Sequence, residues 1–409
     1  MRWLLFIFNT ISELYAIFLL KLNRRQRVLP LPDNISDVYD QKEYQRWQQY
    51  EDETDRFSII SQFISFIWMT FFILSPYYGW ISALLPQNIL LNSLLMIVVT
   101  YTIELITEIP LNYYRIFVIE EKYQMNTMTL HLFIIDLLKD TLINMGILAV
   151  LFLFIHYFSL WFGYMAFVVL FVVLAVIFTL IQRHPLVLMK LFNQFTPLDE
   201  GNLKDQLTQL VYKHGFELKG IYVMDASKRT KRANAFCTGV GKKKEISLDD
   251  NMLEQYSDDE IVAVFAHEFG HAILKHTEKS KWLIYGQLII MFGIFLFVMM
   301  NKWLYADFGI GQLNYFMVMI VLSILLVPIS NVSSLISGYY SRRFEYEADA
   351  FAVKEGYGES LQSVLKKLSR DDLSNIYPHP LVVKLTYSHP PLSQRIEAME
   401  KEKNNDKRC

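Results

Sequence analysis

A run of five residues, His267-Glu268-Phe269-Gly270-His271, has the residue types and spacing of a metal-binding helix. Residues four positions apart lie one turn apart on one face of an α-helix, so His267 and His271 can offer their imidazoles to a single zinc ion. Glu268 follows the first histidine, where its carboxylate can act as a general base for an attacking water without binding the metal. Because only three residues define this motif, it arises by chance in roughly one chain in a hundred of this length, and its surroundings must support it.

A catalytic zinc ion usually has three protein ligands, and the C-terminal part of the sequence offers a third. Glu345 and Asp349 are again four positions apart, so they share one face of a helix predicted over 343–355. We expect Glu345 to bind the metal and Asp349 to accept the outer N–H of a ligating histidine, which would fix the tautomer of that histidine. Glu347 should point roughly the other way. In the alternative interpretation, Glu345 and Asp349 are solvated charges that pair with the two arginines preceding them.

Local signals predict the elements that would hold these residues. Ser257 and Glu260 form a capping-box pattern before the first motif, which predicts a helix from Ser257 to about Lys275. The predicted upstream elements are a helix near 200–214, a strand over 220–224, and a hairpin of strands 234–240 and 245–248. The two cysteines, Cys237 and Cys409, provide neither a disulfide framework nor a cysteine-rich metal site.

The composition indicates a membrane protein. Of the 409 residues, 53% are hydrophobic and 20% are charged, which is too apolar for an ordinary soluble enzyme. The formal net charge of −2 gives no indication of a nucleic-acid partner. Windows apolar enough to span a membrane are 3–20, 57–76, 89–108, 141–157, 160–182, 282–301 and 313–336. Charged residues in or beside them, such as Glu104, Glu108 and Asp136, should face water, a partner or the membrane interface.

The basic residues of the connecting loops predict the orientation. The loops after the first and third windows contain Lys21, Arg24, Arg25, Arg27, Lys42, Arg46, Arg56, Arg115 and Lys122. By contrast, the opposite connections 77–88 and 158–159 contain no Lys or Arg, and 302–312 contains only Lys302. The amino end is therefore expected in the lumen or outside, and the segments 183–281 and 337–409 are both expected in the cytosol, where they can meet.

These features divide the chain into four predicted parts. They are an N-terminal membrane domain of five helices (1–182), a peptidase segment with the first motif (183–281), two membrane helices (282–336), and a C-terminal segment with the third ligand (337–409).

Further short motifs run through most of the chain. They are Phe117-Val118-Ile119-Glu120-Glu121-Lys122, Phe195-Thr196-Pro197-Leu198, Ser227-Lys228-Arg229, Asn234-Ala235, His276-Thr277, Ser341-Arg342-Arg343-Phe344-Glu345 and Ser388-His389-Pro390-Pro391 with Arg395. With the zinc motif, this ordered set resembles the integral-membrane zinc metallopeptidases of the type I CaaX prenyl endopeptidase family, also called the a-factor-converting family.

The resemblance implies an all-α multi-pass membrane protein, in which about seven transmembrane helices enclose a hydrated chamber, with a small α+β gluzincin-like zinc peptidase domain. It implies one zinc ion per chain, the lipid bilayer as surroundings, and prenylated CaaX proteins or peptides as substrates. The expected reaction is removal of the last three residues and, in some members, a second cut upstream. The expected location is the endoplasmic reticulum or inner nuclear membrane in a eukaryote, or the inner membrane in a prokaryote.

The resemblance also implies roles for residues that spacing alone does not single out. Asn234 and Ala235 match an edge strand that holds the substrate backbone by strand addition. His389 matches a position near the zinc that contacts the peptide backbone or the developing oxyanion, and Arg395 is a further candidate for substrate binding. From the residues alone, Asn234 would be a turn residue, His389 a helix-entry residue, and Arg395 part of a salt bridge. His276 should lie on another helix face than the ligands.

Two other functions are compatible with parts of this pattern. A membrane quality-control metallopeptidase would use the same zinc motif without requiring a prenyl group. A metal-binding transporter or channel would use the zinc site for structure and the intramembrane carboxylates as a pathway. The sequence disfavours the transporter, because Glu268 would have no role in a structural site.

Overall fold

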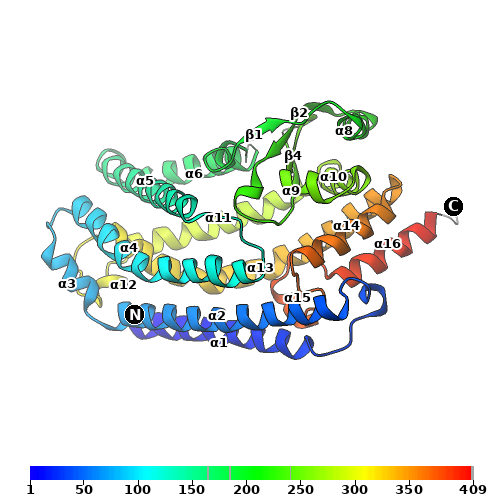
Figure 1. Ribbon diagram of the computed structural model, residues 1–409. Helices are drawn as coiled ribbons and strands as arrows, with labels where there is room; N and C mark the ends of the chain where they lie inside the picture. Colours follow the sequence, from blue (N-terminus) through cyan, green and yellow to red (C-terminus); the bar gives the residue numbers. More distant parts are fainter. Residues whose placement is uncertain (164, 184–185, 240, 407–409) are drawn as a thin grey trace.

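The structure, a computed structural model, describes residues 1–163, 165–183, 186–239 and 241–406. Six helices in this part of the chain are long and apolar enough to cross a membrane. They are α1 (Arg2–Gln26), α2 (Gln41–Leu74), α4 (Ile89–Tyr114) with its π-helical extension η2 (Arg115–Glu120), α5 (Leu130–Phe162), α11 (His276–Met300) and α13 (Tyr315–Lys354). Figure 1 shows long helices running side by side, so the predicted multi-pass helical architecture is confirmed.

The predicted fifth window, 160–182, corresponds to α6 (Met165–Arg183), whose apolar part, Met165–Ile181, is shorter than the other spans. Tyr164, inside that window, lies outside the described residues.

Helix α5 differs from the sequence prediction at both ends. The predicted break at 158–159 is wrong, because α5 continues to Phe162 and ends at Gly163, whose φ of +55° suits a glycine. At its start, α5 is longer than the roughly 20 residues that a bilayer needs. Asp136 in this extension pairs with Arg229 at 2.8 Å, and the Lys139 ammonium donates to the Leu191 carbonyl at 3.2 Å. These charges therefore attach the membrane helix to the following segment.

Helix α13 joins two predicted elements into one. It runs without interruption for 40 residues, so the window 313–336 and the helix 343–355 are parts of the same rod, about 60 Å long. The domain boundary placed after residue 336 thus falls inside a single helix. This continuity fixes the carboxylates at the end of α13 relative to its membrane-spanning part.

A four-stranded sheet lies at one end of the long helices (Figure 1). Its strands are β1 (Phe195–Pro197), β2 (Glu217–Met224), β3 (Ala235–Thr238) and β4 (Lys243–Asp249), arranged in the order β1-β2-β4-β3. Strands β2 and β4 are parallel, and the other two pairs are antiparallel. The predicted hairpin is formed by β3 and β4, although Val240 lies outside the described residues. Strand β1 was not predicted.

Shorter elements complete the chain. They are η1 (Asp33–Ile35), α3 (Tyr77–Leu84), α7 (Leu186–Met189), α8 (Asn202–Lys213), η3 (Ala226–Lys228), α9 (Asp250–Gln255), α10 (Asp258–Ile273), α12 (Trp303–Ala306), α14 (Gly358–Asp371), α15 (Pro380–Thr386) and α16 (Leu392–Asp406). Helices α8 and α10 correspond to the helices predicted at 200–214 and 257–275.

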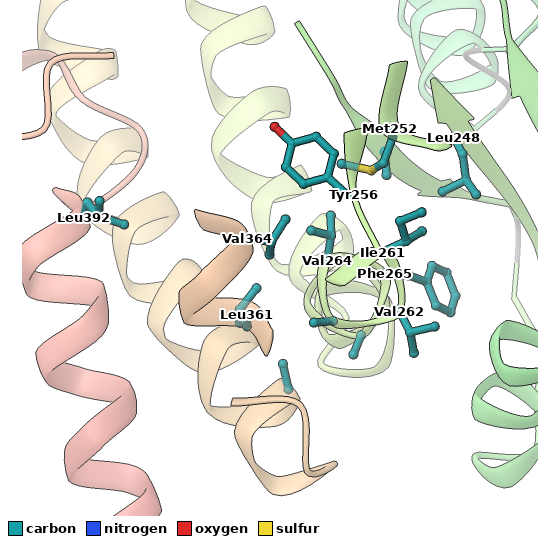
Figure 2. Close-up of a cluster of buried hydrophobic side chains, with 14 of the residues drawn as sticks. Leu248, Met252, Tyr256, Ile261, Val262, Val264, Phe265, Leu361, Val364 and Leu392 are labelled. Carbon is teal, nitrogen blue, oxygen red and sulfur yellow. The ribbon is translucent and has the colours of Figure 1, made fainter. Parts of the chain in front are cut away.

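Helix α10 is the centre of a hydrophobic core at the sheet end of the molecule. Figure 2 shows Ile261, Val262 and Phe265 of α10 between side chains of the sheet region and Leu361 and Val364 of α14. The same core includes buried residues from the loops after α1 and α4. A second core lies among the long helices. The helix with the zinc motif is thus held rigidly on several sides.

Candidate metal centre

The position of α10 against α13 depends on a glycine inside the zinc motif. The start of α10 is fixed by the predicted capping box, which Ser257 and Glu260 form in the structure. Near its other end, a Cβ atom at Gly270 would lie 3.1 Å from the Phe351 ring and 3.3 Å from the Ala348 Cα. The missing side chain therefore lets the two helices cross closely. This crossing brings the carboxylate one turn earlier on α13 to the two histidines of α10.

The ligand atoms of His267, His271 and Glu345 lie within 4.8 Å of one another. Both histidines direct Nε2 inward: His267 Nε2 is 3.4 Å from Glu345 Oε2, and His271 Nε2 is 3.3 Å from Glu345 Oε1. Glu345 is only 5% exposed, yet its Oε2 has no hydrogen-bond partner. Two imidazole nitrogens and one carboxylate oxygen are a donor set that catalytic zinc takes, and an unsatisfied buried carboxylate oxygen suits a bound cation.

Asp349 and Arg395 lie directly behind this cluster. The Asp349 carboxylate is 2.8 Å from His267 Nδ1, so it can accept the outer N–H of that ring. Arg395 donates to both Asp349 oxygens, at 2.8 and 2.6 Å, and its Nη1 lies 3.7 Å from Glu345 Oε2. Burial disfavours a charged imidazole, but the Asp349 carboxylate at Nδ1 and the Glu345 carboxylate near Nε2 outweigh it and raise the pKa of His267 to about 9. The carboxylates therefore favour positive charge here.

Glu268, the expected general base, follows His267 on α10. It is half-buried and interacts electrostatically with Arg395 on α16 and with Cys237 on β3, which places it between these elements. Burial, reinforced by Glu268 and only partly opposed by Lys244, raises the pKa of the Cys237 thiol to about 12. Cys237 therefore stays protonated at neutral pH and is no candidate nucleophile.

Strand β3 forms an edge of the sheet, because it is last in the strand order. The Asn234 carbonyl accepts a hydrogen bond from the Asp249 N–H at 2.9 Å, so it faces β4. The Asn234 side chain accepts from the Ala235 N–H at 2.9 Å. Asn234 is exposed and Ala235 is buried. The residues predicted for substrate binding thus lie at the start of an edge strand that packs against α10.

His389 reaches the cluster from the loop before α16. Its Nε2 is 3.4 Å from Glu345 Oε1, and its Nδ1 is 2.9 Å from the Ser388 hydroxyl. With 61% of its side chain exposed, His389 is accessible to a ligand that approaches the cluster. The structure therefore brings His389, Asp349 and Arg395 to the three predicted ligands, while Asn234 and Ala235 lie at the start of β3, which packs against α10.

Sequence reasoning missed two contributors, His276 and Glu347. His276 Nδ1 is 2.9 Å from His271 Nδ1, and its Nε2 is 3.0 Å from a Glu347 oxygen. The prediction assumed that one helix continues past the motif, which would turn His276 away. Instead α10 ends at Ile273, and Lys275 has a φ of +56°. Glu347 does point away from the ligands, as expected, but it meets His276.

A pocket of about 360 Å³ opens beside the centre, between α11 and α13. Its wall includes Leu283, Ile284, Tyr340 and Phe344, and it reaches Ser388, the neighbour of His389. The lining combines apolar side chains with several serines.

Two family models match the chain. The one described as Peptidase family M48 matches residues 197–403, and the one described as CAAX prenyl protease N-terminal, five membrane helices, matches residues 20–194. The two matches together cover both the membrane helices and the metal centre.

Similar proteins span nearly the whole chain. The CAAX prenyl protease 1 homolog of Arabidopsis thaliana is 30% identical, over 97% of this chain and 95% of that protein. The CAAX prenyl protease 1 of Saccharomyces cerevisiae is 31% identical, over 91% and 90%. The crystal structure of S. mikatae Ste24p superimposes with a TM-score of 0.87 at 28% identity, covering 97% of this chain and 98% of that one.

Proposed function

The chain belongs to peptidase family M48, and we propose that it is a membrane-embedded zinc endopeptidase that cleaves prenylated CaaX proteins near their C-terminus. The observation that supports this most strongly is the His267, His271 and Glu345 cluster beside the edge strand β3. An edge strand can pair with an extended peptide, which would place a peptide bond next to the cluster. The relatives' names and their full-length similarity support the choice of substrate.

In the proposed mechanism, each residue has one task. Zinc held by the two histidines and Glu345 would polarise the scissile carbonyl and acidify water. Glu268 would take the proton from the attacking water and pass it to the leaving amine, so no covalent intermediate forms. His389 would donate to the peptide carbonyl as negative charge develops there.

Asp349 and Arg395 would act from behind the ligands. Asp349 would hold the tautomer of His267 by accepting its outer N–H. Arg395 is only 8% exposed and is bound to Asp349 on both oxygens, so we assign it to positioning these carboxylates in place of the predicted substrate contact.

The proposed product is the prenylated protein without its last three residues, followed in some substrates by a second cut upstream. The proposed orientation places the amino end in the lumen and the metal centre towards the cytosol, because basic residues concentrate on that side. The endoplasmic reticulum is the proposed location, because the similar proteins named above come from eukaryotes.

The experiment uses the purified full-length chain, a farnesylated CaaX peptide and its unprenylated twin, with products identified by mass spectrometry. Glu268→Gln should lower the rate about 10²–10⁴-fold and keep the bound zinc, because only the general base is lost. Glu254→Gln, an exposed carboxylate on α9, is the control and should leave the rate unchanged. Full activity in Glu268→Gln would refute the mechanism, and equal cleavage of both peptides would refute the requirement for the prenyl group.

A further inference from the structure

The two ligating histidines use different partners on their outer sides. His267 Nδ1 faces the Asp349 carboxylate at 2.8 Å. His271 Nδ1 instead faces another imidazole, that of His276, at 2.9 Å between the two Nδ1 atoms. The turn between α10 and α11, with the left-handed backbone of Lys275, folds His276 back onto the preceding helix.

The geometry assigns which ring nitrogen of His271 and which of His276 carries the proton. His271 can bind metal through Nε2 only if its proton is on Nδ1, and that N–H must then be donated to His276 Nδ1. His276 Nδ1 is therefore the acceptor, and its proton lies on Nε2. His276 Nε2 is 3.0 Å from Glu347, whose carboxylate can accept that proton's hydrogen bond. One set of tautomers satisfies every contact.

The surrounding side chains hold this chain of contacts in place. His276 is 3% exposed, and its ring stacks on Phe344 with centroids 4.3 Å apart and an interplanar angle of 10°. Glu347 also accepts from Arg343 at 3.0 Å, and Lys279 lies 3.6 Å away. These two contacts hold the Glu347 carboxylate next to His276 Nε2.

We propose that His276 and Glu347 are positioning residues for the metal centre: they fix the tautomer and ring orientation of His271 and thereby strengthen metal binding. The inference rests on the proposed zinc site. His271 is more exposed than His267, at 23% against 8% of the side chain, so its ring has fewer packing contacts to restrain it. An oriented acceptor at Nδ1 supplies that restraint.

Two substitutions at one position separate hydrogen bonding from packing. His276→Asn keeps an acceptor oxygen near the place of Nδ1 but loses the ring stacked on Phe344. His276→Phe keeps a stacked ring but has no acceptor. Zinc affinity of the purified full-length chain is measured by competition with a chelator of known affinity, and the visible spectrum of the Co²⁺-loaded chain reports ligand geometry.

We expect His276→Phe to weaken zinc binding about 10–100-fold and to change the Co²⁺ spectrum. His276→Asn should stay within about threefold of the wild type. Glu347→Ala should weaken binding in the same direction by a smaller factor, because His276 remains but its tautomer is free. His131→Phe, which removes an exposed histidine on α5, is the control and should bind zinc as the wild type does.

Wild-type affinity in His276→Phe, or equal losses in His276→Phe and His276→Asn, would overturn the proposal. Wild-type zinc affinity in Glu347→Ala would show that Glu347 has no positioning role. A wild-type chain that binds no zinc would contradict the proposed metal centre itself, so the two failures are distinguishable.

Discussion

Arg395 and Asp349 show why a buried ion pair accompanies the metal centre. Asp349 is 1% exposed and Arg395 8%, so neither charge is solvated, and each depends on the other. Removing one partner of a buried pair typically costs about 3–5 kcal/mol, because the remaining charge is left without compensation. Arg395 thus allows a second carboxylate to remain ionised close to Glu345. The sequence offered a salt bridge as one interpretation of Arg395, but it could not identify the partner.

Asp249, at the end of β4, is another buried carboxylate, and it carries a pH-dependent prediction. It is 4% exposed, and its Oδ1 has no hydrogen-bond partner. Burial, with a contribution from Asp250, raises its pKa to about 7. The folded chain then binds a proton that the unfolded chain releases, so stability is lost as the pH rises towards 7.

Asp249→Asn should remove this loss. The thermal midpoint of the variant relative to the wild type should rise between pH 5 and pH 8, by roughly 2–4 °C for each kcal/mol recovered. Tryptophan fluorescence of the detergent-solubilised chain measures the midpoint. Asp33→Asn, an exposed carboxylate, gives the baseline. A midpoint difference that is the same at both pH values would show that Asp249 does not titrate in this range.

At the scale of the elements, the backbone N–H and C=O groups of β3 point alternately towards β4 and towards the free edge of the sheet. In an antiparallel pair, residues that bond to the partner strand alternate with residues that do not. Since Asn234 bonds to Asp249, Phe236 also faces β4, whereas Ala235 and Cys237 direct their N–H groups to the free edge. The Ala235 N–H already donates to the Asn234 side chain. The N–H of Cys237 is therefore the group that an added strand can bond to.

Cys237→Pro should therefore raise KM for a peptide substrate about 2–10-fold, because it removes one intermolecular hydrogen bond worth roughly 0.5–1.5 kcal/mol. Proline is tolerated where the N–H does not bond within the sheet, so the fold should persist. Steady-state kinetics measure KM, and circular dichroism shows whether the fold persists.

Two other variants serve as controls. Cys237→Ser keeps the N–H and should keep KM, while Phe236→Pro should destabilise the sheet. An unchanged KM in Cys237→Pro would argue against strand addition at this edge.

Helix α10 ends earlier and helix α13 continues further than the sequence predicts, and both lengths determine which residues reach the site. Helix α13 passes Gly338 without a break, so it carries Glu345 on the same rod as the membrane span. Helix α10 stops three residues before His276, although no glycine or proline marks the stop. The neighbours of each helix therefore decide its length more than local propensity does.

At the scale of the whole molecule, the elements segregate to two ends. Figure 1 shows the sheet, α10, α14 and α16 at one end of the long helices, and α3 and α12 at the other. The amino group of Met1 pairs with Asp307 at 2.8 Å, so the amino end lies with the loop after α11. This arrangement is compatible with the predicted orientation, in which the two longest extramembrane segments share one side.

Cysteine labelling tests the orientation. In a background with both native cysteines replaced by serine, Glu254→Cys and Lys384→Cys should react with an impermeant maleimide in sealed vesicles whose cytosolic face is outward. Lys302→Cys should react only after the membrane is opened. All three positions are exposed, so access depends on the side of the membrane. Labelling of Lys302→Cys together with the other two would contradict the orientation.

The sequence by itself determined features that depend on neighbouring residues. The four-residue spacing of His267 and His271, the Ser257–Glu260 capping box and the apolar windows follow from helix geometry and from lipid as a solvent, and these act over one or two turns. Such features could be predicted without knowing which elements meet.

Only the tertiary structure decided how these pieces combine. The close crossing at Gly270 selects Glu345 as the carboxylate beside the histidines, and the turn at Lys275 returns His276 to His271. The pairing of Arg395 with Asp349 joins residues 46 positions apart. Each of these contacts depends on packing between distant segments, and neither residue spacing nor local propensity encodes such packing in a single sequence.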